Sequence, residues 1–495
     1  MNCFQLKVHC GDETVTLCAD GEKSILESLG TTHAPESPCG GRGICGKCSV
    51  ELKGLLRSFD SGEIAEINGR VSACRFAPAG DCEIWLNRQS KVRIETAEKL
   101  KISGGGEGLG LAIDLGTTTV AAAVYDLPTG ECLAEKSELN AQRIFGADVL
   151  SRIEHCRKGQ LEEICRVTEK QLSSLTEENE KISRVSIVGN TVMEHLAAGL
   201  NPTYMAIPPF TPKSLFGECA RSDIWPNAEV YFARCVSAYV GGDIAAGMLA
   251  CGLENAEGLQ LYVDIGTNGE IAMGNRHGYK TCATAAGPAF EGAEIECGMN
   301  AAEGAIDAVW AENGEIFAHV IGEGKAKGIC GSGLIDAAAM LLDLGLLGRN
   351  GRLISVDKAP ENLKSRFTER EGVRAFLLCD EVYVTQHDIR KIQLAKAAIR
   401  AGIETLMKNE EISMLTVAGG FGKHLNVRNA MRIGLIPHIP EEKVRQVGNA
   451  AAKGAALLLE DAAEEKLRAF ADSFEYVDLS SAKEFSEKYI SYLNF

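Results

Sequence analysis

Apolar and polar residues alternate through the first twenty residues, and the polar triplet Gly11-Asp-Glu interrupts the alternation. A period of two with a central turn is typical of a β-hairpin, so we expect paired strands between Phe4 and Leu17. Ser24 follows as a candidate N-cap for a stretch with helical apolar spacing that stops at Gly30. On this pattern the chain begins with strand, strand and helix.

Two segments far apart in the chain share another pattern, an apolar run that ends in Asp-x-Gly-Thr. They are Leu111-Ala-Ile-Asp-Leu-Gly-Thr-Thr-Thr-Val120 and Leu261-Tyr-Val-Asp-Ile-Gly-Thr-Asn-Gly-Glu270. Each predicts a β-hairpin with glycine at the turn, where backbone N–H groups can approach an anion closely. The neighbouring hydroxyl groups add donors, and the aspartate can hold a hydrated Mg²⁺ against phosphates.

The repeated pattern predicts two similar lobes that face one ligand, and a nucleotide suits this chemistry. On this hypothesis the catalytic residues are Asp114 and Asp264. The phosphate-binding residues are Gly116, Thr117 and Thr118 in the first hairpin and Gly266, Thr267 and Asn268 in the second. A structural duplication without a ligand is the alternative.

Composition and charge mainly indicate which classes of protein this chain does not belong to. The 495 residues carry a net charge of −17 and no long basic run, which argues against a nucleic-acid-binding protein and against an anionic membrane surface. No apolar run approaches the length of a membrane span, and the first residues lack the basic start and apolar core of a signal peptide. We therefore expect a cytoplasmic protein of about three domains.

One group among the 18 cysteines has metal-ligand spacing. Three lie in Cys39-Gly-Gly-Arg-Gly-Ile-Cys45-Gly-Lys-Cys48, and Cys74 follows in a later segment. Three thiolates on a glycine-rich loop and a fourth from elsewhere match a two-iron, two-sulfur (2Fe-2S) cluster, and the pattern resembles ferredoxins. A structural zinc site is the alternative, although such sites usually join two compact pairs of ligands. The other N-terminal cysteines are expected to be buried strand residues: Cys3, Cys10, Cys18 and Cys82.

A change of composition separates this part from the rest of the chain. A charged stretch from Lys91 to Lys101 leads into Ser103-Gly-Gly-Gly-Glu-Gly108, which is typical of a flexible tether. We therefore expect a ferredoxin domain at 1–90, a linker at 91–107 and a nucleotide-binding body from residue 108. A surface loop within one domain is the alternative.

Two segments of the body have two interpretations each. Val185-Ser-Ile-Val-Gly-Asn-Thr191 predicts a strand whose last residues face the ligand or cap the next helix, on which His195 is expected to be packed. Gly328-Ile-Cys-Gly-Ser-Gly-Leu-Ile-Asp336 predicts a helix start that meets the nucleotide or allows close packing.

A long helix is predicted further on. Thr385 or Asp388 is its candidate cap, and Ile389, Ile392 and Ala395 give it an apolar face. Its basic residues are expected on the solvated face: Arg390, Lys391 and Lys396.

The body resembles the actin-like ATPase superfamily, which also contains sugar kinases and heat-shock chaperone ATPases. The two hairpins resemble its phosphate loops, and Tyr239–Leu249 and Gln446–Ala455 resemble its two connecting helices, whose small residues let the lobes pack closely. Val417-Ala-Gly-Gly-Phe-Gly422 resembles its adenosine motif, in which Gly419, Gly420 and Gly422 would leave room for base and ribose.

This resemblance implies a fold class: an α+β ferredoxin-like (β-grasp) domain followed by a two-lobed α/β actin-like ATPase core. The core would span 108–460, with lobes near 108–250 and 251–445, and 461–495 would form a C-terminal tail.

A ferredoxin fused to such a core resembles one family closely, the ATP-dependent reductive activators of corrinoid proteins. Asn140–Arg152, Ala285–Gly292 and Gly328–Asp336 look like blocks of that family. The resemblance implies one-electron transfer from a 2Fe-2S cluster to Co(II), giving Co(I), with ATP and Mg²⁺ as further cofactors. It implies a corrinoid protein of a methyltransferase system and an upstream electron donor as partners, and leaves formation of a homodimer open.

Other functions stay open from the residues alone. An ATP-dependent electron donor to a dehydratase has a similar core, but it would hold a four-iron cluster between two subunits. The core cysteines Cys282, Cys297 and Cys330 are available for such a cluster, although they lack cluster spacing. A small-molecule kinase with an iron–sulfur sensor needs no electron transfer, and neither does a binding module whose ATPase regulates docking.

Overall fold

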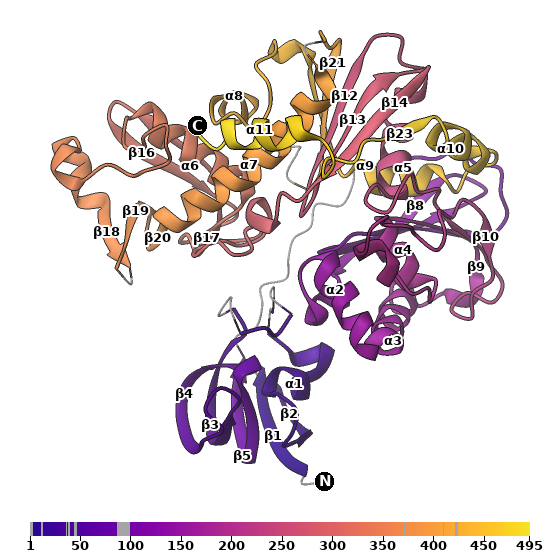
Figure 1. Ribbon diagram of the computed structural model, residues 1–495. Helices are drawn as coiled ribbons and strands as arrows, with labels where there is room; N and C mark the ends of the chain where they lie inside the picture. Colours follow the sequence, from indigo (N-terminus) through magenta and orange to yellow (C-terminus); the bar gives the residue numbers. More distant parts are fainter. Residues whose placement is uncertain are drawn as a thin grey trace. The chain divides into compact units, whose positions relative to one another are not determined.

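The computed structural model describes residues 3–10, 13–35, 37, 40–43, 47–86, 100–370, 372–408, 410–420 and 424–495 (Figure 1). The chain forms two compact units. One contains residues 1–91 and 139–172, and the other contains residues 92–138 and 173–495. Within the described ranges no helix is both long enough and apolar enough to cross a membrane.

A five-stranded sheet forms the N-terminal part of the first unit, in the order β2-β1-β5-β3-β4. β1 and β5 pair in parallel, the other neighbours pair antiparallel, and α1 packs against the sheet. The predicted hairpin and the α+β class are therefore confirmed. The elements are β1 (Cys3–Cys10), β2 (Glu13–Asp20), α1 (Ile25–His33), β3 (Ser49–Ser58), β4 (Ile64–Ser72) and β5 (Phe76–Leu86).

The predicted N-cap of α1 is confirmed, but the predicted stop is wrong. Ser24 and Glu27 form a capping box, in which each side chain accepts a hydrogen bond from the other residue's backbone N–H. Gly30 has a φ of 62° and interrupts the helical backbone, and the helix resumes and ends at His33. Glycine at this position therefore produces a kink rather than an end.

The four cysteines expected to be buried on strands all lie on strands of this sheet, but only Cys82 is buried. Cys3 and Cys18 are exposed and joined by a disulfide bond, because the antiparallel register of β1 and β2 brings their positions together. Cys10 is half-buried. The expectation of burial was therefore wrong for Cys3 and Cys18.

The first unit also contains α2 (Val149–His155) and most of α3 (Leu161–Ser173). Asp148 caps α2 by accepting a hydrogen bond from the Ser151 backbone N–H. The buried guanidinium of Arg152 donates to the carbonyl of Gly146 and to the side chain of Gln142.

Two six-stranded sheets organise the second unit, in the orders β10-β11-β9-β6-β7-β8 and β22-β21-β12-β13-β14-β23. β6 pairs antiparallel with β7 and parallel with β9, just as β12 pairs with β13 and β21. The prediction of two similar lobes built on the two hairpins is therefore confirmed.

The strands of these sheets have the following bounds. The first sheet contains β6 (Leu109–Leu115), β7 (Thr119–Asp126), β8 (Glu131–Leu139), β9 (Ile182–Gly189), β10 (Cys219–Ala220) and β11 (Glu229–Phe232). The second contains β12 (Gln260–Ile265), β13 (Gly269–Asn275), β14 (Gly278–Thr284), β21 (Met414–Ala418), β22 (Val444–Gly448) and β23 (Phe474–Tyr476).

The two lobes meet through α5 (Gly242–Ala250) and α9 (Ala450–Leu457), which pack against each other. A Cβ added to Gly454 would lie 2.5 Å from the backbone carbon of Ala246, so only glycine fits at this contact. The expectation that small residues allow close packing of the lobes is confirmed at this position.

Further elements of the second lobe are two three-stranded sheets and three helices. The sheets contain β15 (Ala305–Glu312), β16 (Glu315–Val320) and β17 (Gly328–Ile329), and β18 (Phe367–Arg370), β19 (Val373–Cys379) and β20 (Val382–Thr385). The helices are α6 (Gly331–Asp343), α7 (Gln386–Met407) and α8 (Val427–Arg432).

The long helix α7 is capped as predicted, and both candidates take part. Thr385 Oγ1 accepts from the Asp388 backbone N–H, and the Asp388 carboxylate accepts from the Thr385 backbone N–H. Arg390 is exposed as expected. Lys396 is buried instead, because α11 and the residues after it cover this face of α7 (Figure 1).

Residues 461–495, expected to form a tail, pack against both lobes: Arg184 of β9 pairs with Asp461 and Glu464, whereas α11 packs on α7. They contain α10 (Ala463–Ala471) and α11 (Lys483–Ser491), and between these helices β23 pairs in parallel with β14. The segment before β6 is also held: the N–H groups of Ile102 and Gly105 donate to the carbonyls of Gly130 and Leu127. Residues 91–99 of the expected linker lie outside the described residues.

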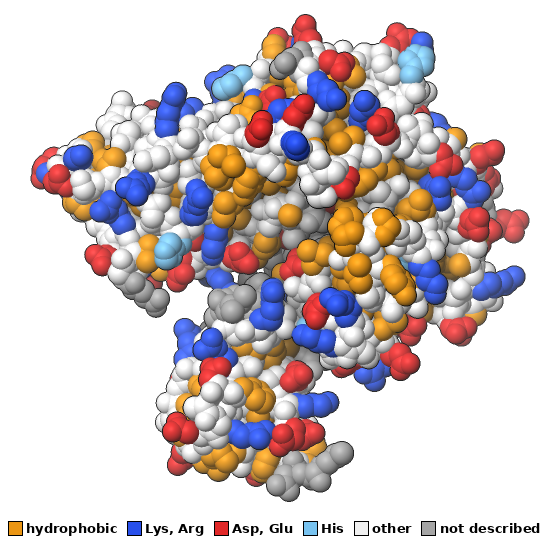
Figure 2. Space-filling model, viewed as in Figure 1, with side chains coloured by type: hydrophobic (Ala, Val, Ile, Leu, Met, Phe, Trp, Pro, Cys, Tyr) orange, Lys and Arg blue, Asp and Glu red, His pale blue; other side chains and the backbone are white. Residues whose placement is uncertain are grey.

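Acidic and basic side chains are interspersed on the face drawn in Figure 2. This face therefore presents no single large basic patch.

Candidate functional site

The first Asp-x-Gly-Thr turn joins β6 to β7. Asp114 lies near the end of β6, is partly exposed, and accepts a hydrogen bond from Asn449 Nδ2 at 2.8 Å. Thr117 is buried, and its hydroxyl accepts from Asn190 Nδ2 at 2.8 Å. Both amides come from distant segments, Asn449 from the N-cap of α9 and Asn190 from the N-cap of α4 (Thr191–Ala197).

The sequence left two interpretations of Asn190 open. Its Oδ1 accepts a hydrogen bond from the Met193 backbone N–H, so it caps α4, while its Nδ2 contacts the first turn. The capping interpretation is therefore confirmed, and contact of Asn190 with a ligand stays a prediction. His195 is fully buried, with Nδ1 against the Thr191 carbonyl, as expected for a packed side chain.

The second turn joins β12 to β13 and has the same form. Asp264 is partly exposed near the end of β12, and the Tyr262 hydroxyl lies 3.4 Å from its Oδ2. The Gly266 N–H donates to the Asn268 carbonyl and closes the turn.

The structure brings the two turns together. The hydroxyl oxygens of Thr118 and Thr267, which are 149 residues apart in sequence, lie 3.3 Å apart. Glu291 bridges them: the Thr118 hydroxyl donates to Glu291 Oε2 at 2.6 Å, and the Thr267 hydroxyl donates to Oε1 at 2.8 Å. The predicted meeting of the hairpins is therefore observed at the level of side chains.

Carboxyl groups accumulate around these turns. Burial raises the pKa of Asp114 to about 6, against the hydrogen bond from Asn449, which lowers it. Burial raises the pKa of Asp264 to about 7, and the charge of Asp114 adds to this effect. Burial and the charges of Asp114 and Asp264 raise the pKa of Asp243 to about 8. Burial and the charges of Asp243 and Asp264 hold the pKa of Glu270 well above its usual range.

The raised pKa values show that ionisation of these carboxyl groups is disfavoured, because like charges in a desolvated cleft repel one another. A divalent cation relieves this repulsion, and Mg²⁺ in nucleotide sites usually uses one or two carboxylates together with phosphates and water. In the described part of the chain no three His, Cys, Asp or Glu side chains form a ready metal cage. The site therefore fits a cation that arrives with a phosphate ligand.

Sequence reasoning missed three residues of this site: Asp243, Glu291 and Asn449. Asp243 lies in the first turn of α5 and Asn449 caps α9, both within the segments that resembled connecting helices. Glu291 lies in the block Ala285–Gly292. Polar residues in these glycine- and alanine-rich segments were the available signal.

The segment that resembled an adenosine motif follows β21. Gly419 has a φ of 102°, and an added Cβ would lie 2.3 Å from the Ile265 carbonyl oxygen, so glycine is required there. Gly420 has open space around its Cα. Gly422 lies outside the described residues.

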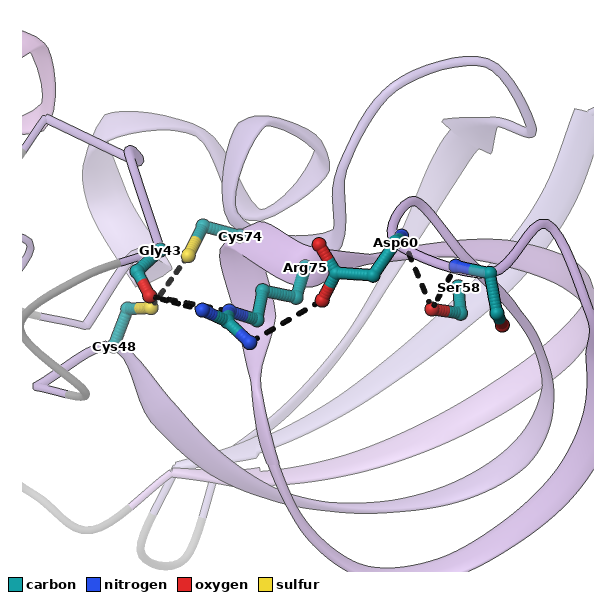
Figure 3. A network of polar contacts seen from close by, with 7 residues as sticks. Gly43, Cys48, Ser58, Asp60, Cys74 and Arg75 are labelled. Atoms are coloured by element: carbon teal, nitrogen blue, oxygen red, sulfur yellow. Dashed lines mark hydrogen bonds and ion pairs between the residues drawn. The ribbon is translucent and has the colours of Figure 1, made fainter.

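Two of the four candidate cluster ligands belong to the described residues. Cys48 Sγ and Cys74 Sγ lie 3.2 Å apart and point toward each other (Figure 3). Two metal–sulfur bonds of about 2.3 Å at a tetrahedral angle would separate their sulfurs by about 3.8 Å. The observed separation is shorter than this, so the two sulfurs would have to move apart to bind one metal ion. Cys39 and Cys45 lie outside the described residues.

Arg75 holds the loop beside these thiols. Its guanidinium donates from Nε and Nη2 to the Gly43 carbonyl, at 3.1 and 2.7 Å, and Nη1 pairs with Asp60 at 3.2 Å (Figure 3). The Ser58 hydroxyl in turn accepts from the Asp60 N–H. This network anchors Gly43 of the glycine-rich loop to the short 3₁₀ turn that carries Cys74.

The core cysteines do not support a second cluster. Cys282 and Cys330 are buried, and burial raises the pKa of both thiols, so both favour the protonated form. Cys297 is half-buried, and the described residues contain no group of three metal-ligating side chains around it.

Comparisons with known proteins match this architecture. A model described as "RACo middle region" matches residues 109–256, and a model described as "C-terminal domain of RACo the ASKHA domain" matches residues 258–495. A solved "Reductive activator for corrinoid,iron-sulfur protein" covers 99% of this chain and 98% of its own, with a TM-score of 0.73 and 28% identity. The chain belongs to the RACo family.

Two curated relatives support the assignment to the RACo family. The "Corrinoid activation enzyme RamQ" of Eubacterium limosum is 37% identical over 381 residues, which are 71% of this chain and 64% of the relative. The "[Co(II) methylated amine-specific corrinoid protein] reductase" of Methanosarcina barkeri is 26% identical over 389 residues, which are 69% of this chain and 68% of that protein. The chain thus matches less than two thirds of the length of RamQ.

Proposed function

We propose that this RACo-family protein uses ATP to drive one-electron reduction of a corrinoid protein from Co(II) to Co(I). The observation that carries the proposal is the meeting of the two Asp-x-Gly-Thr turns beneath a cluster of desolvated carboxyl groups. The matches to an activation enzyme and to a Co(II) corrinoid protein reductase support the choice of a corrinoid protein as partner.

In this proposal the two turns bind the nucleotide phosphates. Asp114 and Asp264 position Mg²⁺ and water, and the hydroxyl and backbone N–H groups of the turns donate to phosphate oxygens. The donors come from Gly116, Thr117, Thr118, Gly266, Thr267 and Asn268. Gly419, Gly420 and Gly422 leave room for the base and ribose.

Cys39, Cys45, Cys48 and Cys74 would hold a 2Fe-2S cluster, which supplies one electron at low potential. A plant-type ferredoxin has a potential near about −400 mV. For an acceptor about 200 mV lower, transfer is disfavoured by roughly 4.6 kcal/mol, since each ~59 mV costs a factor of ten for one electron. A second, favourable process must offset this unfavourable free energy of electron transfer.

Nucleotide binding can offset it only if ATP binds two conformations with different affinities. The two lobes joined at α5 and α9 are the candidate two-state element. Closure on ATP would favour the conformation competent for transfer, and hydrolysis would reset the complex and release the partner.

The test is anaerobic purification followed by iron counting, electron paramagnetic resonance and a corrinoid-reduction assay. We expect two iron ions per chain, a reduced 2Fe-2S signal, and Co(I) formation that requires ATP. Asp264→Asn should keep the cluster signal and lose the stimulation by ATP. Equal reduction with and without ATP would contradict the coupling, and an iron-free protein would contradict the electron carrier.

A further inference from the structure

Glu291 stands out among the acidic residues of the cleft because its carboxylate spans both phosphate loops. Its two oxygens accept the Thr118 and Thr267 hydroxyls separately, at 2.6 and 2.8 Å. A Cβ added to Gly266 would lie 3.5 Å from Glu291 Oε1, so the carboxylate also lies close to the second glycine turn. One anion thus occupies donors from both lobes.

A carboxylate in this position has the hydrogen-bonding chemistry of a phosphate. Both are anionic groups with oxygen acceptors, and both suit the hydroxyl donors of an Asp-x-Gly-Thr turn. A nucleotide phosphate that took these donors would meet the charge of Glu291 at short range. The two anions cannot share the same two hydroxyl protons, so one must leave.

We infer that Glu291 is a positioning residue that holds the two phosphate loops together without nucleotide and is displaced from Thr118 and Thr267 when a nucleoside triphosphate binds. This inference rests on the proposed nucleotide site. The Glu291 bridge keeps the hydroxyl groups of both lobes facing one another. It also weakens nucleotide binding, because the nucleotide must displace Glu291 from these hydroxyl groups.

The local fold suits a displaceable bridge. Glu291 ends the short 3₁₀ turn Pro288–Glu291, and Gly287 and Gly292, which flank the turn, have φ values of 76° and 77°. The preceding residue, Phe290, is fully buried in the core of the second lobe and anchors the turn. The turn contacts α6 and α7, so a change at Glu291 reaches two helices of the second lobe.

The deciding experiment compares the affinity of wild type and Glu291→Gln for the Mg²⁺ complex of a non-hydrolysable ATP analogue by calorimetry. Loss of the competing charge should tighten binding about fivefold or more, as expected for one unit charge at about 4 Å in water. Glu294→Gln is the matched control, because Glu294 is exposed and three residues away. It should bind as wild type does.

Weaker binding by Glu291→Gln would overturn the inference, since Glu291 would then assist the nucleotide. Unchanged binding with a lower thermal midpoint would also overturn it, because the bridge would then be structural only. Failure of the wild type to bind the analogue would overturn the nucleotide site itself. The first two results leave the proposed function standing.

Hydrogen–deuterium exchange of residues 285–292 gives a second readout that does not depend on the variant's stability. In wild type, the analogue should increase exchange in this segment, because displacement releases the turn from the threonines. Increased protection, or no change, would contradict displacement.

Discussion

Asp243 lies in surroundings that partly favour and partly oppose its negative charge. It lies in the first turn of α5, where the helix dipole favours a negative charge, and its Oδ1 accepts a hydrogen bond from the Ile244 N–H. Burial and the charges of Asp114 and Asp264 nevertheless raise its pKa from 3.8 to about 8. Desolvation and repulsion therefore outweigh the dipole at this residue.

The raised pKa of Asp243 predicts that the free energy of unfolding depends on pH. A carboxyl group with a raised pKa binds its proton more tightly in the folded state, so the free energy of unfolding falls as the pH rises from about 4 to about 8. In metal-free protein, Asp243→Asn should remove part of this fall and be more stable than wild type at pH 8.5 by about 1 kcal/mol or more. Urea denaturation between pH 5 and pH 8.5 measures the free energy of unfolding of both proteins.

Asp223→Asn is the matched control, because Asp223 is exposed and the change in charge is the same. It should leave the slope unchanged. A parallel slope for Asp243→Asn and wild type would show that Asp243 is not repelled by its neighbours.

Arg75 is a charged residue beside Cys74, which together with Cys48 is one of the proposed cluster ligands. Because a positive charge stabilises the reduced cluster, Arg75→Gln should lower the reduction potential, by roughly 30 mV for a partly screened charge. Spectroelectrochemical titration measures the shift. Lys53→Gln, which removes an exposed charge from β3, should shift the potential less. Equal shifts would assign the effect to net charge rather than to the loop that Arg75 holds.

At the scale of elements, the crossing of α5 and α9 is the contact on which the two lobes depend. Both helices are built of small residues, and the Gly454 Cα faces the Ala246 backbone. Their close approach also places Asp243 and Asn449 beside the two aspartates of the turns. The spacing of the helices therefore sets the geometry of the cleft.

Gly454→Ala should lower the free energy of unfolding by about 1–3 kcal/mol, because the added methyl overpacks a backbone contact. The gain in helix propensity offsets only about 1 kcal/mol of this cost. The variant should also weaken nucleotide binding, as the helices move apart. Ala452→Ser, at a half-buried position of α9, is the control for both measurements. Unchanged stability would show that the crossing is looser than the structure indicates.

At the scale of the whole molecule, the last residues of the chain close the second lobe. The ammonium of the buried Lys396 donates to the Asn494 carbonyl and lies 5.1 Å from the ring of Phe495, and Gln393 donates to the Leu493 carbonyl. Burial lowers the pKa of Lys396 to about 8. These contacts cover α7 with α11, as Figure 1 shows.

Deletion of residues 483–495 should therefore destabilise the second lobe, because it uncovers Lys396 and the apolar side chains packed beside it. We expect a fall in the thermal midpoint of several degrees, corresponding to a loss of roughly 2–4 kcal/mol. Phe495→Ala should give a smaller fall in the same direction. A deletion variant as stable as wild type would show that α11 is peripheral.

Local sequence determined much of this protein. The hairpins, the caps at Ser24 and Thr385, and the two Asp-x-Gly-Thr turns follow from side-chain period, turn chemistry and capping, which act between residues a few positions apart. For the same reason, the sequence identified the cysteine spacing and the aspartates of the turns.

Only the tertiary structure decided which distant groups meet. Asn449 reaches Asp114, Glu291 joins Thr118 to Thr267, and β23 completes a sheet begun two hundred residues earlier. Lys396, which helical spacing placed on a solvated face, is covered by the end of the chain. Such contacts depend on how whole elements pack, and no local pattern encodes the partner that packing will supply.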